Sequence, residues 1–313
     1  MIRFKTQTPW LVVMGFFIIM AVTWGMGAGP LLAGNAMPFA QGRLFEVSKP
    51  GATPNYVFGT MHVADRDVLR LPPPIALAFK GSRMLLVESD HDPVETYKIV
   101  EAMFLPEGRS LQDMLKPALY EEIVTAAEAV GMKERDVNRL RPWAIWILLG
   151  DPADESVRRA SGQPVLDDAL RLYASKRGVP VMALDRAAEI AALFTVGLSE
   201  ADQLQLLENA LRDPMSYDER YNAMRQSYLA GDLEALLMSM RPDDKTATEA
   251  QRQFADRFNH GLLTERNRRW IPRMTRHFKR GGVFVAVGAA HLPGETGILN
   301  LLEKAGYQVK RVL

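Results

Sequence analysis

The chain has 313 residues, of which 48% are hydrophobic and 24% are charged, and it contains no cysteine. This is enough apolar material for one large core or two small ones. The lack of cysteine excludes disulfides, thiolate metal ligands and cysteine nucleophiles, so any metal ion must be held by histidine and carboxylate groups. A formal net charge of +1 gives no electrostatic reason to expect a nucleic-acid partner.

The first 36 residues have the order of an export signal. Arg3 and Lys5 precede an apolar run at residues 10–23, and small residues with a candidate cleavage site at residues 34–36 follow it. A bilayer is spanned by about 20 apolar residues, so residues 11–33 also suit a retained membrane anchor. Cleaved signal and anchor both stay open. Either one predicts export, to the periplasm or to the outer face of a membrane, with the folded domain spanning residues 40–313.

Three apolar runs that predict buried strands each end near a residue able to bind metal. The runs are residues 56–58, 84–87 and 283–287, and they lead into Gly59-Thr-Met-His62, Glu88 and Gly288-Ala-Ala-His291, respectively. A helix expected at residues 75–80 connects the first two strands, and such crossovers make strands parallel. Because ligands collect at the carboxyl edge of parallel strands, we expect these two histidines and the glutamate to lie close together.

The remaining pattern predicts an α/β fold with a mixed central sheet. Both chain ends supply strands, at residues 44–47 and 307–312 beside those above, and residues 179–184 add one more. Helical periodicity dominates from about residue 93 to residue 280. We therefore expect a large helical insertion that covers the site.

A helix expected after residue 262 carries an arginine on its buried face. Trp270, Met274 and Phe278 repeat every four residues, and Arg266 precedes them on the same face. A buried arginine needs an anionic partner, because an unpaired buried charge is costly. Pro272 predicts a kink in this helix or a late start.

Other polar residues have simpler interpretations. Asp185, after the strand at residues 179–184, is expected to cap the following helix. His91 competes with the nearby Glu88 as a ligand, but its flanking aspartates favour a solvated loop. His260 and His277 are expected at the surface or at a helix end. Three tyrosines, at positions 217, 221 and 228, are expected in the core, with an exposed stripe along a peptide groove as the alternative.

Five motifs together resemble the TraB/GumN family, which is similar to the Tiki metalloproteases. They are Gly59-Thr-Met-His62, Leu86-Val-Glu88, Leu140-Arg-Pro-Trp143, Leu263-Thr-Glu-Arg-Asn-Arg-Arg-Trp270 and Val285-Ala-Val-Gly-Ala-Ala-His-Leu-Pro-Gly294. The resemblance covers essentially the whole chain after the amino-terminal signal. It implies a metal-dependent hydrolase with His62, His291 and Glu88 as its metal set. Two departures from the family pattern, at Val165-Leu-Asp167 and Leu184-Asp185-Arg186, weaken any expectation of a supporting role for Asp167 and Asp185.

The chemistry of this residue set agrees with hydrolysis. Two imidazoles and a carboxylate leave coordination positions for water and substrate, and they suit zinc, manganese, cobalt or iron. Glu88 serves either as the third ligand or as the general base, and both stay open. Arg266 is a candidate to stabilise a developing oxyanion, with Asn267 or Glu295 as supporting groups.

The sequence thus predicts an exported metal-dependent hydrolase, most simply a peptidase that acts on peptides or proteins outside the cytoplasm. One alternative is a non-catalytic regulatory protein that binds a peptide or a metal in the same pocket. Another is a metal-dependent esterase on the same scaffold. No feature of the sequence fixes the substrate, the metal or the oligomeric state.

Overall fold

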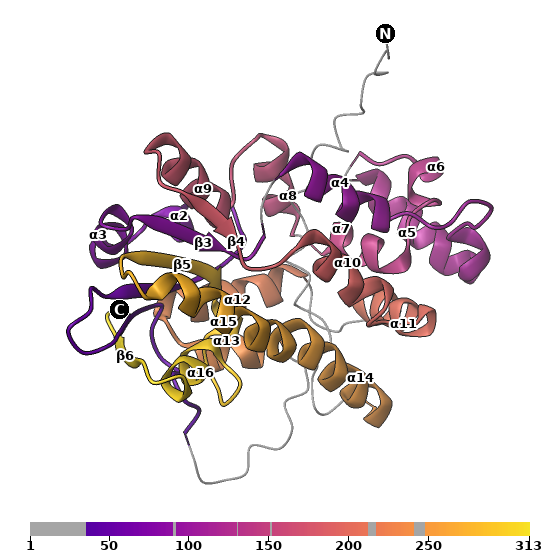
Figure 1. The fold of residues 1–313 in the computed structure, drawn as a ribbon. Helices are drawn as coiled ribbons and strands as arrows, with labels where there is room; N and C mark the ends of the chain where they lie inside the picture. Colours follow the sequence, from indigo (N-terminus) through magenta and orange to yellow (C-terminus); the bar gives the residue numbers. More distant parts are fainter. Residues whose placement is uncertain (1–35, 90–91, 130, 151, 212–216, 241–247) are drawn as a thin grey trace.

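The computed structural model describes residues 36–89, 92–129, 131–150, 152–211, 217–240 and 248–313. Within these ranges the chain forms a six-stranded mixed sheet, with a group of helices beside it (Figure 1). The strands are β1 (Leu44–Ser48), β2 (Asn55–Thr60), β3 (Met84–Val87), β4 (Val181–Ala183), β5 (Val283–Gly288) and β6 (Gln308–Arg311). The predicted α/β class and the mixed sheet built from both chain ends are therefore confirmed.

The strand order across the sheet is β4-β3-β5-β2-β1-β6. The first four strands in this order are parallel, whereas β1 runs antiparallel to both β2 and β6. Strand β5 lies between β2 and β3, with Gly288 opposite Thr60 and Ala286 opposite Val87. All residues from Val283 to Val287 are buried, as is typical of a central strand in a parallel sheet. The carboxyl ends of four neighbouring strands consequently meet at one edge.

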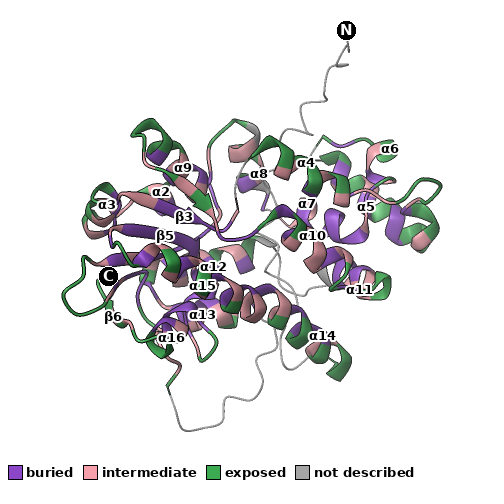
Figure 2. Ribbon diagram, in the orientation of Figure 1, coloured by how far each residue is buried: buried purple, intermediate pink, exposed green. Residues whose placement is uncertain are grey.

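Helices near the sheet share its core. The core is a cluster of buried apolar side chains that joins the strands to seven helices (Figure 2). They are α2 (Arg66–Leu69), α3 (Pro73–Lys80), α9 (Leu166–Lys176), α12 (Tyr217–Ala230), α13 (Leu233–Ser239), α15 (Arg266–Phe278) and α16 (Ile298–Lys304).

A second core lies within the helical insertion. Its centre is α7 (Pro142–Leu149), whose residues from Pro142 to Ile147 are all buried. Trp143 stacks on Phe194 with ring centroids 4.6 Å apart, which ties α7 to a later helix. The other helices of the insertion are α4 (Pro93–Ala102), α5 (Pro117–Ala129), α6 (Glu134–Val137), α8 (Ala153–Ala160), α10 (Ala187–Thr195), α11 (Glu200–Leu211) and α14 (Glu249–Asn259). Two 3₁₀ turns, Gln112–Met114 and Ala289–His291, complete the elements.

The helix that carries Arg266 differs from its prediction. A π-helical segment, His260–Glu265, joins α14 to α15 without a break, and α15 begins at Arg266 with Pro272 inside it. The prediction that this helix starts late, at Pro272, is therefore wrong. The first turn of α15 continues the π-helical segment, so the helix is already formed before the proline.

The predicted signal or anchor at residues 1–36 lies, apart from its last residue, outside the described residues. None of the helices in the described ranges is both long and apolar enough to cross a membrane.

Candidate active site

Four parallel strands each deliver one polar side chain to the same edge of the sheet. In sheet order these are Asp185 after β4, Glu88 after β3, His291 after β5 and His62 after β2. Nε2 of His62 lies 3.5 Å from Oε1 of Glu88, and Nε2 of His291 lies 3.9 Å from the same oxygen. Glu88 and His291 are buried, and the His62 side chain is only 12% exposed. The expected convergence of these three residues is thus present.

Gly288, at the end of the middle strand, leaves room for this convergence. Its N–H donates a hydrogen bond to Oε1 of Glu88 over 2.6 Å. A Cβ atom at this position would lie 3.1 Å from that oxygen and 3.6 Å from Nε2 of His62. Only glycine therefore lets His62 and Glu88 approach each other across β5 without a shift of the neighbouring side chains.

The ring of His62 is oriented by a carboxylate from the helical insertion. Oδ2 of Asp167, at the start of α9, lies 2.7 Å from Nδ1 of His62, and the Thr60 hydroxyl donates to Oδ1 of Asp167. Burial lowers the pKa of His62, but the charges of Asp167 and Glu88 outweigh it and raise the pKa to about 10. Asp167 thus contacts the site although the departure from the family pattern had weakened that expectation.

Helix α8 holds the backbone of the His62 turn. Oε1 of Glu155, a fully buried carboxylate, accepts a hydrogen bond from the Ala64 N–H over 2.6 Å. Arg159 donates to the His62 carbonyl over 2.6 Å and also pairs with Glu155. The insertion therefore fixes both the ring and the backbone of this histidine.

The ring of His291 is oriented by an amide. Nδ1 lies 2.6 Å from Oδ1 of Asn267, whose Nδ2 donates to the carbonyls of His291 and Thr296. Because the amide nitrogen faces two acceptors, the amide oxygen faces the ring, so Nδ1 carries the proton and Nε2 the lone pair. Burial lowers the pKa of His291 to about 3, with the charges of Arg266 and His62 adding to the effect against that of Glu88. His291 is consequently neutral.

Asn267 therefore takes the supporting place expected for it, whereas Glu295 does not. Glu295 is exposed, and it pairs with Lys304 over 3.3 Å on the surface.

Arg266 holds the acids of the site together. It donates from Nη2 to Oε2 of Glu88 over 2.5 Å and from Nε to Oδ2 of Asp185 over 2.7 Å. Its Nη1 lies 3.2 Å from Nε2 of His291. Burial raises the pKa of Glu88, but the charge of Arg266 lowers it well below its usual value, with smaller contributions from both histidines. The anionic partners predicted for this buried arginine are thus present.

The predicted role of Asp185 as a helix cap is wrong. The N-cap of α10 is Arg186, and Asp185 instead accepts hydrogen bonds from Arg266 and from Nε1 of Trp270. A buried carboxylate takes the strongest donors within reach, and here these are a guanidinium and an indole.

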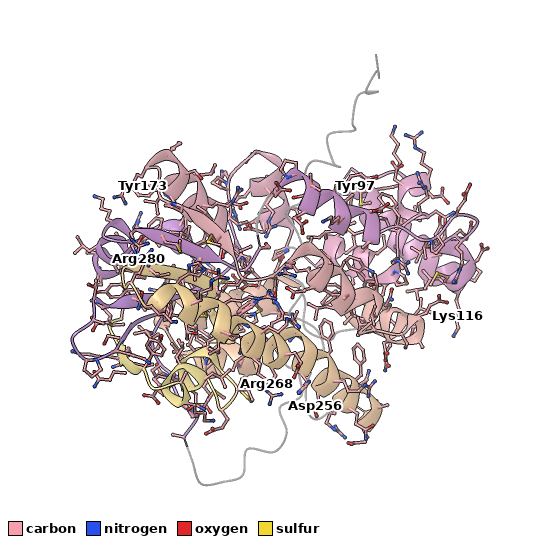
Figure 3. All side chains as sticks on the ribbon, in the orientation of Figure 1. Tyr97, Lys116, Tyr173, Asp256, Arg268 and Arg280 are labelled. Atoms are coloured by element: carbon pink, nitrogen blue, oxygen red, sulfur yellow. The ribbon has the colours of Figure 1, made fainter. Side chains whose placement is uncertain are left out.

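The π-helical segment His260–Glu265 aims Arg266 into the site. Nη1 of Arg266 also donates to the Leu262 carbonyl within this segment, and the guanidinium stacks over Trp270 at 4.5 Å. Arg268 is labelled in Figure 3 and lies on the outer side of α15, where it is 56% exposed and pairs with Glu265. No signal in the sequence distinguishes a π turn from an ordinary helical one.

An apolar pocket adjoins the polar cluster. Tyr228 is part of its wall, and the Tyr228 hydroxyl donates to the Gly59 carbonyl at the start of the His62 turn. Tyr221 packs against the same core, so the core interpretation holds for these two tyrosines, while the side chain of Tyr217 lies outside the description.

The other histidines lie away from the site or outside the description. His260 is exposed and pairs with Glu265, and His277 lies at the end of α15. His91 falls outside the described residues.

The donor chemistry of the cluster suits a divalent ion, although its present arrangement is closed by Arg266. Among the described residues, no group of three or more histidine, cysteine, aspartate and glutamate side chains is arranged to hold a metal ion. Yet both rings have an oxygen at Nδ1, which turns Nε2 inward as metal-binding histidines require. Nε2 of His62 is buried, and in the described part of the chain it faces only Oε1 of Glu88, at the long distance of 3.5 Å. The unsatisfied nitrogen and the oriented rings fit a metal-ligand role.

The fold and the site define an α/β protein with a buried His, Glu and Arg cluster at the carboxyl edge of a parallel sheet. The chain belongs to the TraB/PrgY/gumN family, whose sequence pattern matches residues 43–311.

Curated relatives of the chain are metalloproteases by name. Metalloprotease TIKI1 of Danio rerio is 24% identical over 304 residues, covering 82% of this chain and 60% of the relative. Metalloprotease TIKI homolog of Nematostella vectensis is 24% identical over 307 residues, covering 83% of this chain and 65% of the relative. The chain thus spans less than two thirds of the length of these relatives.

Proposed function

We propose that the protein is an exported metal-dependent hydrolase, and that it cleaves peptide bonds at the cluster of His62, Glu88 and His291. The observation that carries the proposal is the orientation of both imidazoles, each with an oxygen at Nδ1 and with Nε2 directed to Oε1 of Glu88. The relatives are metalloproteases by name and are 24% identical to this chain over the aligned residues, and their names favour the same reaction class.

In this proposal His62, His291 and Glu88 would hold a divalent ion. Such an ion supplies a Lewis acid that activates water near neutral pH and polarises the scissile carbonyl. Glu88 serves as a ligand rather than as the base, because, despite burial, the charge of Arg266 lowers its pKa well below the usual value and so makes the carboxylate a weak proton acceptor. Asn267 keeps His291 in the tautomer that presents Nε2. Asp167 orients His62, which is protonated in the absence of an ion because its pKa is raised to about 10, and its Nε2 proton would leave when an ion binds.

Arg266 has a separate role in the reaction. Its Nη1 approaches Nε2 of His291, which cannot accept a hydrogen bond while its lone pair binds an ion. The Nη1 hydrogen that faces His291 is then free to donate to the carbonyl oxygen of a bound peptide, where negative charge develops, while the other stays with the Leu262 carbonyl. Asp185 and Glu88 keep the guanidinium in place meanwhile.

Metal content and peptide hydrolysis of the purified full-length chain test the proposal. We expect about one divalent ion per chain, lost in the His62→Ala/His291→Ala double variant together with hydrolysis of a peptide library. The matched control is His277→Asn, a histidine at the end of α15 and away from the site. Peptide binding without hydrolysis under every metal loading would favour a regulatory binding protein, and cleavage of esters alone would favour an esterase.

A further inference from the structure

The pocket beside the polar cluster is mainly apolar. Besides Tyr228 and small residues of the Gly288 turn, its wall consists of large aliphatic and thioether side chains. These are Met61, Met224, Leu236, Met240, Leu262 and Leu263. The charged groups among the described lining residues are those of the site itself, and Glu88 and Arg266 pair with each other. The aliphatic and thioether part of the wall therefore offers no counter-charge to a charged guest.

The wall is assembled from separate parts of the fold. Met61 directly precedes His62, Met224 and Tyr228 lie on α12, and Leu236 lies on α13. Leu262 and Leu263 come from the π-helical segment that also directs Arg266. The same local structure thus shapes the apolar wall and places the guanidinium.

The pocket is also continuous with the atoms proposed to react. Its lining includes Gly288, Ala289 and Ala290, which form the turn between β5 and His291. A side chain inserted here would lie directly beside Glu88 and His291, so the backbone that carries it would pass over the cluster. Methionine side chains are flexible and polarisable, and they adapt to apolar guests of different shapes.

We propose that this pocket is the specificity pocket of the enzyme, and that it receives a large apolar side chain, such as leucine, methionine or phenylalanine, next to the bond that is cut. The inference rests on the peptidase function proposed above and adds its substrate class. An apolar guest gains from leaving water. A charged guest would lose its hydration among the aliphatic and thioether side chains without finding a partner there, so discrimination of about 100-fold or more is expected.

A set of internally quenched peptides that differ at one residue tests the assignment, with the metal-loaded full-length chain. We expect kcat/KM to be about 100-fold higher for leucine, methionine or phenylalanine at one position flanking the cut than for aspartate or lysine there. Ala290→Leu, at a half-buried position of the wall, should shift the preference towards alanine by narrowing the pocket.

A charge in the wall gives a second readout. Leu263→Asp, at a partly buried position, should lower cleavage next to an apolar residue and raise cleavage of the lysine peptide relative to the leucine peptide. Leu172→Asp is the matched control, because Leu172 is 47% exposed on α9, and it should leave the preference unchanged.

Binding of an uncleavable peptide with an N-methylated central bond, followed by calorimetry, separates the two proposals. Hydrolysis without preference, together with equal Kd values for the leucine and aspartate analogues, would overturn the pocket assignment alone. A leucine analogue that binds about 100-fold more tightly while no peptide is cut would overturn the peptidase function and support the pocket. Unchanged selectivity in both wall variants would contradict the assignment.

Discussion

Asp167 Oδ2 lies 2.7 Å from Nδ1 of His62, although one residue belongs to the helical insertion and the other follows strand β2. The contact makes the insertion part of the site as well as its cover. The carboxylate holds the ring so that Nε2 points towards Glu88.

Replacing this carboxylate should weaken metal binding without removing a ligand. Asp167→Asn is expected to lower the affinity for a divalent ion by about 10- to 100-fold, because the neutral amide makes Nε2 of His62 less basic. Competition with a chromogenic chelator measures the affinity. The control is Asp168→Asn. Asp168 is the next residue on the same helix, and it pairs with Arg171 and not with His62. An unchanged affinity in Asp167→Asn would show that the carboxylate does not act through the ring.

Removing the central guanidinium should destabilise the whole domain. Arg266→Met removes the guanidinium that Glu88 and Asp185 share and leaves Asp185 only the more distant Arg269 at 3.5 Å, so we expect a loss of about 3–5 kcal/mol in the free energy of unfolding. Urea unfolding followed by tryptophan fluorescence measures this loss. The control is Arg268→Met on the exposed side of α15, for which a change of no more than about 0.5 kcal/mol is expected. Equal effects of the two variants would contradict the buried network.

Adding one methyl group at the end of β5 should disturb the cluster more than the fold. In Gly288→Ala the new Cβ would lie 3.1 Å from Oε1 of Glu88 and 3.7 Å from Cδ2 of His291. We expect peptide hydrolysis to fall at least about tenfold, since small misplacements of reacting groups are costly, while the melting temperature changes little. Gly261→Ala has no atom within 4 Å of its new Cβ and should retain full activity.

The loss of folding stability at acid pH should depend on Glu189. Hydrogen bonds and charge from Arg273 lower the pKa of Glu189 to about 2 against its usual 4.5, although burial opposes the shift. Between these pH values the unfolded chain binds more protons than the folded one, so this stabilisation is complete above pH 4.5 and disappears as the pH falls towards 2. Glu189→Gln should therefore lower stability at pH 7 by roughly 1 kcal/mol after solvent screening. Urea unfolding from pH 2 to pH 7 should show a shallower acid slope in this variant, and parallel curves would contradict the assignment.

The main parts of the cluster were accessible from sequence. His62, Glu88 and His291 each follow a short apolar run, and such runs in an α/β pattern predict parallel strands that end at a common edge. The anionic partner of Arg266 followed from the cost of burying a charge. Local pattern and one electrostatic rule were sufficient for these residues.

Other features depended on tertiary structure. The neighbours of β5 are set by long-range pairing, which strand patterns do not reveal. Asp185 has the sequence position of a helix cap, but a guanidinium and an indole from α15 compete for it and prevail. Asp167 reaches His62 only because α9 packs beside the β2 turn, so its contact had no local signal.

The position of β5 has a consequence for how the sheet folds. This strand follows β2, β3 and β4 in the sequence, yet both of its edges are paired, with β2 on one side and β3 on the other. Until β5 is in place, no strand joins β2 to β3, and each of the two presents an unpaired backbone edge. A truncation before residue 283 would therefore leave β1 with β2 and β3 with β4 as two separate ladders, and we expect such a chain to associate instead of folding.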